Sequence, residues 1–410
     1  MSAQPSFEPP RGMRDFYPAD MRWREKVFGA FRASAEAFGF EPYDACVVES
    51  YDLLARKSGE EVGEQIYHFN DKSERHLALR PEMTPTLARM VAQRRKELPL
   101  PLKWTTIAQC FRYERMTKGR KREHYQWNLD IIGEDSVLAE VEVVGAAVDA
   151  LKRMGLSSAD FKVRVSSRKF LGSLLAASGI AQEKHAQVFL ALDKRGKMPD
   201  EEIAAMLADG GLSPEETKAA FDIMDVKSFE GCAELEEFFR LAAAAGFADS
   251  LVFDIGVIRG LSYYTGIVFE CFDTAGSYRA IFGGGRYDNL LTAIGGEPTS
   301  AVGLGFGDVV VTELLKSRLG ESAAAARKGV AVGFMFPEQR DAAVMLAAKL
   351  RAEGNRVDLA LVNQKPKKFF SHADSSGAAE AVFLGPDDVE KGVARLKNLE
   401  TREEKEICLR

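Results

Sequence analysis

The sequence TTIAQCFRYERMTKGRKREHYQWNLDIIG, residues 105–133, contains two strand-like segments joined by a strongly basic loop. Residues 105–113 and 123–132 have the composition of strands, and residues 115–122 form the loop between them. From position 112 to position 122 there are six basic side chains and one acid, Glu114. A basic loop of this kind is suited to binding phosphates.

The second strand-like segment has two chemically different faces. The two-residue period of a strand places Gln126, Asn128 and Asp130 on one face, while the other face is apolar and can be buried. A row of amide and carboxylate groups beneath a basic loop predicts a site for a polar ligand. The alternative is an amphipathic hairpin with a solvated tip, which we disfavour because such tips rarely carry so much charge of one sign.

Composition limits the classes of protein that remain. The chain has 410 residues, 46% hydrophobic and 28% charged, which predicts two to three globular domains. No run is long and apolar enough to span a membrane, and the first residues lack a secretory signal. Five scattered cysteines without a CxxC pair argue against a zinc site and for a reducing cytoplasm. The net charge of −6 requires any contact with a polyanion to be local.

The order of the expected elements predicts an α+β protein. The expected helices are residues 19–38, 86–97 and 136–154, and the expected strands, besides the opening pair, are residues 41–49, 65–69, 76–80, 161–165, 250–258 and 267–272. Between them, residues 171–245 carry 7 basic and 14 acidic side chains and are rich in alanine. This change of composition predicts a separately folded helical insertion at about residues 170–246.

The last part of the chain reads as a separate domain. Residues 317–327 form a plausible linker. Strands are expected at residues 330–335, 356–361 and 381–384, with helices at 337–354 and 367–376 between them and a charged hairpin at the end. This alternation predicts a compact α/β domain with a mostly parallel sheet.

Two further stretches carry chemical groups on constrained backbone. In Leu79-Arg80-Pro81-Glu82-Met83-Thr84-Pro85 two prolines hold Glu82 and Thr84 on a turn between a strand and a helix, although Glu82 could instead be a first-turn carboxylate that favours the helix dipole. In the strand at residues 301–307, three alternate glycines leave one bare face, against which a flat ring could lie. The spacing fits neither a dinucleotide-binding glycine motif nor a Walker A loop.

Together these groups predict a site for ATP and a small ammonium-bearing substrate. Arginines at 112, 120 and 259 could neutralise phosphates, Glu82, Gln126 and Asp130 could hold an amine, and Tyr263 and Tyr264 offer phenol groups. The expected reaction is attack of a substrate oxygen on phosphorus, in which positioning and charge stabilisation supply most of the catalysis.

The chain resembles the histidyl-tRNA synthetases, a family of class II aminoacyl-tRNA synthetases, over nearly its whole length. The matching motifs are RGMRDF (11–16), LRPEMTP (79–85), FRYERMTKGRKREHYQ (111–126), RGLSYYTGIVFE (259–270) and GGGRYDNL (283–290). The resemblance implies a class II antiparallel sheet flanked by helices in a catalytic domain of residues 1–325, which includes the helical insertion, and a C-terminal α/β anticodon-binding domain of residues 328–410. It also implies a cytoplasmic homodimer that acts on ATP, with Mg²⁺, on L-histidine and on tRNA(His).

The same resemblance implies a role for each matching residue. Histidine would be bound by Glu82, Met83, Thr84, Arg112, Gln126, Asp130, Arg259, Tyr263 and Tyr264. ATP would be bound by Arg112, Glu114, Arg120, Gly303, Gly305 and Gly307, with Arg112 and Arg259 as the catalytic residues. The tRNA would meet Arg115, Lys118, Lys121 and Arg122, and no metal ion would be held by the protein alone.

The chain departs from the family pattern at three positions. Cys46 stands where the first motif usually has a proline, and Ser262 where an aspartate is common. The helix after Gly307 begins Asp308-Val309-Val310 and lacks the arginine that normally binds the γ-phosphate. Either Arg120 or another arginine, such as Arg286, would then have to replace it.

The missing arginine leaves a second hypothesis from a different class. Synthetase-like chains also serve as non-catalytic regulatory subunits of ATP phosphoribosyltransferase. Such a subunit is expected to lose the RGLxYYTG motif and the anticodon-binding domain, and this chain keeps both. A module that only binds tRNA is a weaker alternative, because it would not need the ATP residues. The motifs therefore favour an active ligase.

Overall fold

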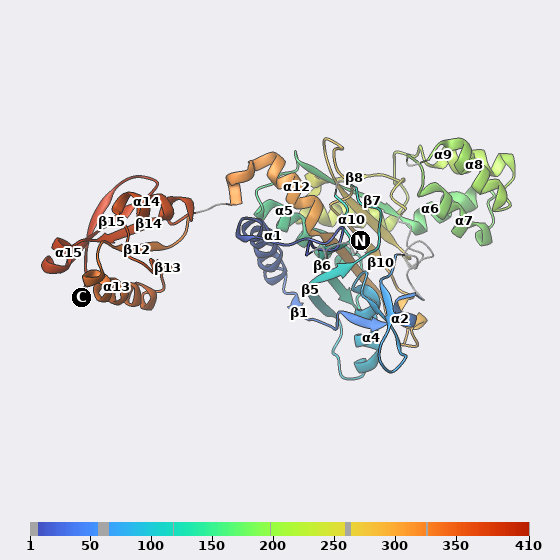
Figure 1. Cartoon of the computed structure of the whole chain (residues 1–410). Helices are drawn as coiled ribbons and strands as arrows, with labels where there is room; N and C mark the ends of the chain where they lie inside the picture. Colours follow the sequence, from blue (N-terminus) through green and yellow to red (C-terminus); the bar gives the residue numbers. More distant parts are fainter. Residues whose placement is uncertain are drawn as a thin grey trace, which may run out of the picture. The chain divides into compact units, whose positions relative to one another are not determined.

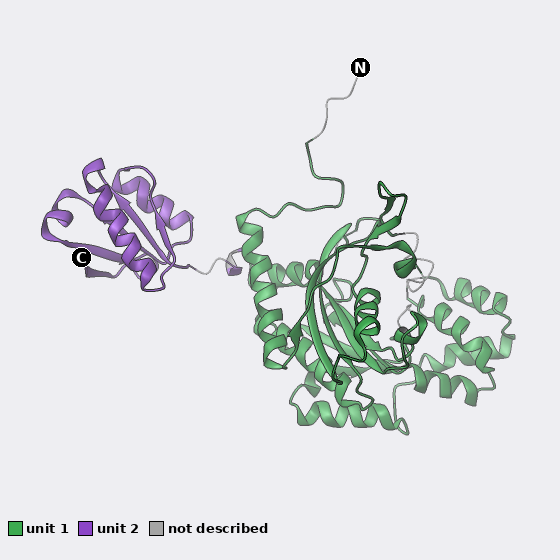
Figure 2. Ribbon diagram, turned by 90° about the horizontal axis from the view of Figure 1, so that it is seen from below, with its two compact units in different colours: residues 1–320 green, residues 321–410 purple. Residues whose placement is uncertain are grey.

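The computed structural model describes residues 7–55, 65–117, 119–196, 198–258, 264–324 and 327–409. It divides into two compact units, residues 1–320 and residues 321–410 (Figure 2). The chain passes from one unit to the other within the segment expected to be a linker. Among the described residues, no helix has the length and apolar character needed to cross a bilayer.

The first unit is built on a sheet of eight strands (Figure 1). In their order across the sheet the strands are β1 (Glu41–Pro42), β5 (Leu102–Phe111), β6 (Glu123–Ile132), β11 (Ala301–Gly307), β10 (Phe282–Arg286), β9 (Ile267–Asp273), β7 (Phe161–Ser167) and β8 (Leu251–Phe253). All neighbours are antiparallel except the two outermost pairs, β1 with β5 and β7 with β8. The predicted antiparallel sheet is therefore confirmed.

The hairpin of β5 and β6 forms as the sequence predicts. The two strands pair along their full length, with Ala108 opposite Gln126 and Trp104 opposite Asp130. The apolar face of β6 is buried, and its Trp127 stacks on Phe31 at a ring-centroid distance of 4.5 Å. Asp130 on the opposite face is also buried, so the polar row lies beneath other parts of the protein and not in solvent.

Helices cover the Trp127 face of the sheet. This helical layer consists of α1 (Pro18–Ala37), α5 (Leu138–Arg153), α10 (Ala233–Ala244) and α12 (Asp308–Leu319). Helix α1 packs against α5 and α12, and Ser34 Oγ donates a hydrogen bond to the Ala146 carbonyl across the first contact. Helix α10 packs against α5. The other face of the sheet is thereby left to carry the candidate site.

A smaller sheet lies ahead of the hairpin in the chain. It consists of β2 (Val48–Ser50), β4 (His76–Leu79) and β3 (His68–Asn70), and the helices near it are α2 (Tyr51–Ala55), α4 (Thr84–Arg94) and α11 (Leu290–Ala293). The single strand predicted at residues 41–49 is wrong, because β1 and β2 belong to different sheets. The buried Arg80 guanidinium satisfies the carbonyl groups of Ala45 and Cys46 at this break, at 2.9 and 3.4 Å.

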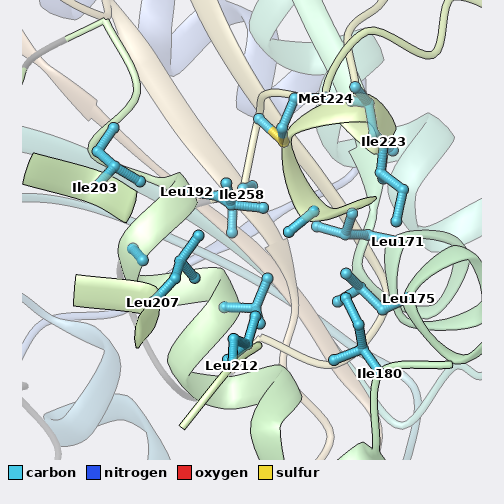
Figure 3. Close-up of a cluster of buried hydrophobic side chains, with 14 residues drawn as sticks. Leu171, Leu175, Ile180, Leu192, Ile203, Leu207, Leu212, Ile223, Met224 and Ile258 are labelled. Atoms are coloured by element: carbon cyan, nitrogen blue, oxygen red, sulfur yellow. The ribbon is translucent and has the colours of Figure 1, made fainter. Parts of the chain in front are cut away.

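The helical insertion has a hydrophobic core of its own (Figure 3). It comprises α6 (Arg168–Ala177), α7 (His185–Leu192), α8 (Asp200–Asp209) and α9 (Pro214–Ile223). Leu171 and Leu207 are among its buried side chains, and Ile255 and Ile258 from beyond β8 join them. Helix α10 shares the acidic composition but contributes nothing to this cluster. The strand predicted at residues 250–258 also ends early, at Phe253.

The second unit is an α/β domain with helices on both faces of a five-stranded sheet. The strands, in order, are β13 (Val357–Leu359), β12 (Val330–Phe334), β14 (Glu380–Leu384), β15 (Val393–Asn398) and β16 (Glu404–Cys408), and the helices are α13 (Arg340–Ala352), α14 (Pro366–Ser375) and α15 (Pro386–Lys391). The first three strands are parallel, and the last two form the expected hairpin. Val332 packs with Leu346 in one core and Ala331 with Phe369 in another, as alternate residues of one strand require.

Candidate active site

A cavity of about 360 Å³ lies on the polar face of the main sheet and gathers most of the predicted site residues. The predicted histidine- and ATP-binding residues that line it are Glu82, Thr84, Arg112, Glu114, Gln126, Arg120, Tyr264, Gly303, Gly305 and Gly307. Lys121, predicted to meet tRNA, also lines it. Residues that are far apart in the sequence are therefore brought to one place.

The remaining predicted residues lie elsewhere. Met83 is fully buried beside Ala108 and Cys110 and does not line the cavity. Arg115 and Arg122 line a separate hollow of about 510 Å³ near the hairpin loop. Three other predicted residues, Arg259, Tyr263 and Lys118, lie outside the described part of the chain.

The turn that carries Glu82 is fastened to the end of β5. Arg112 Nε donates to the Pro81 carbonyl at 2.9 Å, and the Phe111 amide donates to the Arg80 carbonyl at 2.9 Å. Helix α4 begins at Thr84, and Glu82 is buried with its side chain in the cavity wall. Glu82 precedes the N-cap Met83, and the first turn of α4 contains no acid, so the alternative of a first-turn carboxylate is wrong.

Asp130 is buried against Gly303 and Tyr287 of the cavity wall, with one carboxylate oxygen bound and the other without a donor among the described residues. The Tyr287 hydroxyl, which belongs to a residue lining the cavity, donates to Asp130 Oδ1 at 2.5 Å, while no described residue donates to Oδ2. Burial raises the pKa of Asp130 to about 7; the hydrogen bond from Tyr287 opposes this rise, and the nearby negative charge of Glu82 adds to it. A ligand N–H directed at Oδ2 would pair with this buried oxygen.

The glycines of β11 make room for side chains of the neighbouring strand. A Cβ atom on Gly303 would lie 2.1 Å from Asp130 Oδ1, and one on Gly305 would lie 2.9 Å from the Gln126 amide. Gly307 has open space on this side. The predicted flat shelf for a ring is therefore occupied by protein at two of its three positions and open at the third.

Glu114 lies between the two arginines at the hairpin end of the cavity. Arg112 Nη1 is 3.9 Å and Arg120 Nε 2.7 Å from the Glu114 carboxylate. The second contact is electrostatic, because the Arg120 Nε–H has no hydrogen-bond partner among the described residues despite the short distance. The guanidinium groups of Arg112 and Arg120 both line the cavity, and both pair with the single carboxylate of Glu114.

Two family models match nearly the whole chain. The model of histidyl-tRNA synthetase matches residues 12–307, and the model of an anticodon-binding domain matches residues 329–409. The chain belongs to the histidyl-tRNA synthetase family. Its curated relatives include the chloroplastic/mitochondrial histidine–tRNA ligase of Arabidopsis thaliana, 42% identical over 98% of this chain and 85% of the relative. The histidine–tRNA ligase of Natronomonas pharaonis is 37% identical over 97% of this chain and 95% of the relative.

Solved structures of synthetases have the same fold. The histidyl-tRNA synthetase from Nostoc superposes with a TM-score of 0.82 over 99% of this chain and 97% of that one, at 23% identity. A protein of Bacillus halodurans described as an ATP phosphoribosyltransferase regulatory subunit/histidyl-tRNA synthetase superposes with a TM-score of 0.76 at 23% identity, over 93% of this chain and 99% of that one. At this identity the likeness concerns the fold alone.

In this synthetase-family chain Arg286 cannot replace the arginine that is missing from the helix after Gly307. Its guanidinium is buried and makes two hydrogen bonds of 2.7 Å to the Glu140 carboxylate. Its remaining N–H groups donate to the Glu134 and Ser136 carbonyls and to the Ser300 hydroxyl. Every N–H group of the Arg286 guanidinium donates within the protein. The expectation that Arg286 replaces the missing arginine is therefore wrong.

Sequence reasoning gave no individual role to two residues that line the cavity, or to Arg14, which joins β6 to the start of α12. Tyr287 of the GGGRYDNL motif holds Asp130, and Arg279 lines the cavity from the loop before β10. Arg14 of RGMRDF contacts Glu123 of β6 and, at 3.0 Å, Asp308 at the start of α12. The motif pattern marked Arg14 and Tyr287, whereas nothing in the sequence marked Arg279.

Proposed function

We propose that the protein is a histidine–tRNA ligase, which uses ATP to join L-histidine to tRNA(His) through a histidyl-adenylate. One observation carries the proposal: the buried Asp130, whose Oδ2 has no donor among the described residues, is held by Tyr287, and Tyr287 lines the same cavity as Arg112 and Arg120. A carboxylate that accepts from an imidazole N–H selects histidine, because other amino acids would leave a buried charge unpaired. Family membership and the relatives named histidine–tRNA ligase support the same activity.

In the first step the histidine carboxylate attacks the α-phosphorus of ATP. A new O–P bond forms, the bond from the α-phosphorus to the bridging oxygen breaks, and pyrophosphate leaves with the electron pair. Glu82, Thr84 and Gln126 hold the ammonium end of histidine, while Arg112 and Arg259 stabilise the charge that develops at the α-phosphate. Charge stabilisation of this kind contributes about a hundredfold or more in rate per donor.

Magnesium would be held mainly by the substrate. The described residues contain no group of three or more carboxylate, histidine or cysteine side chains suited to a metal ion. The cavity does offer the carboxylates of Glu114 and Glu270, and Mg²⁺ is commonly bound by one or two carboxylates together with phosphate oxygens. The donor set therefore fits a Mg²⁺ ion that arrives with ATP and neutralises its phosphates.

In the second step the terminal ribose hydroxyl of tRNA attacks the carbonyl carbon of the adenylate. An ester bond forms, AMP leaves, and the hydroxyl proton is released. The hollow lined by Arg11, Arg115 and Arg122 supplies positive charge beside the loop and would contact the acceptor end, with Lys118 and Lys121. The anticodon-binding domain of the second unit would contact the other end of the tRNA.

Two further properties belong to the proposal. We infer a homodimer, which is supported by the exposed Val47 and Val48 side chains in the first-motif region. We also infer a cytoplasmic enzyme, which agrees with five free cysteines. Light scattering on the purified chain tests the dimer, since the expected mass is twice the 45.2 kDa of the chain.

The proposed function is tested by exchange between pyrophosphate and ATP. With histidine and Mg²⁺ the purified chain should catalyse this exchange, and with tRNA(His) it should form histidyl-tRNA. Other amino acids should support little exchange. A folded chain that catalyses no histidine-dependent exchange would overturn the proposal and favour a regulatory subunit of ATP phosphoribosyltransferase.

A further inference from the structure

We propose that Arg279 binds the terminal phosphates of ATP and stabilises the pyrophosphate leaving group. The inference rests on the proposed function, since it concerns how that site holds ATP. Arg279 lies in the loop between β9 and β10 and lines the same cavity as Arg112 and Arg120. Four observations carry the assignment.

The start of α12 leaves part of the cavity wall without a cation. The residues of this helix that line the cavity are Val309 and Val310. The hairpin loop closes against them, since a Cβ on Gly119 would lie 3.2 Å from Val310 Cγ2. ATP carries three or four negative charges, whereas the hairpin brings three cations to the cavity, Arg112, Arg120 and Lys121, and its two arginines share Glu114.

Arg279 is available for an anion. Its side chain is exposed, and no carboxylate pairs with it among the described residues. Arginine presents a rigid fork of N–H donors that matches phosphate oxygens. An arginine that lines a ligand cavity without an internal partner is therefore a ready phosphate contact.

The backbone on both sides of Arg279 is held in place. The buried Asp273 carboxylate accepts hydrogen bonds from the Ser277 and Tyr278 amides at 2.9 and 3.0 Å. On the other side the Ile281 amide donates to the Cys271 carbonyl at 2.7 Å. A contact made from an anchored loop costs less conformational entropy than one from a free loop.

The sheet register places Arg279 away from the end of the cavity that holds Asp130. Gly285 of β10 is opposite Gly303 of β11, which is opposite Asp130 of β6. Phe282 is three residues earlier on β10, or about 10 Å along the strand, and Arg279 precedes it. With the imidazole at Asp130 and the α-phosphate beside the histidine carboxylate, the terminal phosphates extend toward this far end.

The test compares two ligands that differ in the terminal phosphates. ATP has them, whereas a non-hydrolysable histidyl-sulfamoyl-adenosine fills the histidine and adenosine sites without them. In a calorimetric titration, Arg279→Ala should bind ATP at least about tenfold more weakly than wild type, because one or two charged hydrogen bonds are lost. Its affinity for the analogue should stay within about twofold of the wild-type value. Arg279→Lys should recover part of the ATP affinity, because it keeps the charge and loses the fork.

The control variant is Arg22→Ala, which removes an exposed arginine of α1 that does not line the cavity and should bind both ligands normally. The inference is overturned if Arg279→Ala weakens ATP less than tenfold, or if it weakens the analogue as much as ATP. Calorimetry measures binding without turnover. A wild-type chain that binds ATP but catalyses no exchange would therefore refute the proposed function. The comparison of ATP affinity between wild type and Arg279→Ala would still decide the role of Arg279.

Discussion

Asp130 shows how burial prepares a single side chain for one ligand. Tyr287 fixes one carboxylate oxygen, and the other has no donor from the described protein. Because burial raises its pKa to about 7, the carboxyl is mostly protonated at about pH 6 and mostly ionised at about pH 8. Only the ionised form accepts a hydrogen bond at both oxygens.

Histidine use should therefore improve as the pH rises through neutrality. In the exchange assay we expect kcat/KM for histidine to increase between about pH 6 and pH 8, as Asp130 loses its proton. Asp130→Asn should raise the KM for histidine at least about tenfold and remove that part of the pH dependence. Asp130→Asn also serves as the control for the titration of the substrate imidazole, because that titration is the same in assays of both proteins. An unchanged KM, or the same rise with pH in both proteins, would contradict the assigned role.

Sequence periodicity was most informative where one strand carried the whole signal. The period of two placed Gln126 and Asp130 on one face of β6, where Gln126 lines the cavity and Asp130 accepts from the cavity-lining Tyr287. Residues from distant strands were harder. Neighbours Arg286 and Tyr287 point to opposite sides, one to Glu140 and the other to Asp130, as successive residues of extended chain do. Without the strand register, the sequence could not tell which of them faces the ligand.

At the level of elements, β11 and the β5–β6 hairpin form one unit of the site. Three alternate glycines on β11 predicted a bare surface, but a strand read by itself does not reveal the side chains of its neighbour. Asp130 and Gln126 fill the space at Gly303 and Gly305, and Gly307 alone stays open. The hairpin ends and the burial of Trp127 were predictable because a long, strictly alternating strand gives an unambiguous pattern.

This division of the glycines predicts different defects for two similar substitutions. Gly303→Ala places a methyl group against Asp130 and should raise the KM for histidine, whereas Gly307→Ala adds a methyl group in the open part of the cavity and should raise the KM for ATP. At Gly303 an overpacking cost of about 1–3 kcal/mol corresponds to about fivefold to 150-fold in affinity. Steady-state exchange kinetics with each substrate varied in turn would separate them. Equal effects of both variants on both substrates would contradict the division.

Composition described the insertion only in part. The acidic, alanine-rich stretch includes α10, yet α10 packs against α5 and not with α6 to α9. Amphipathic helices with similar composition can bury their apolar faces against different partners, so composition alone did not locate the limit of the insertion. In the same way, residues 41–49 had strand composition, but the carbonyl groups bound by Arg80 interrupt the strand.

On the scale of the whole molecule, the two units have separate cores. Buried residues of the second unit, such as Val332 and Phe369, pack only with others of that unit in their clusters. The alternation of strands and helices made this domain predictable, because each βα step buries one helix face on the sheet. The residues that line the cavity all belong to the first unit.

Removing the second unit should therefore separate the two half-reactions. A chain ending at Gly320, after α12, should fold and keep histidine-dependent pyrophosphate exchange within about fivefold of the full chain, because its core and cavity are intact. Charging of tRNA(His) should fall at least about a hundredfold in kcat/KM, since one of two linked RNA contacts is lost. Thermal unfolding of the truncated chain provides the control for folding. If it unfolds cooperatively and yet lacks exchange, the adenylation site depends on the anticodon-binding unit; if it charges tRNA normally, that unit contributes no RNA contact.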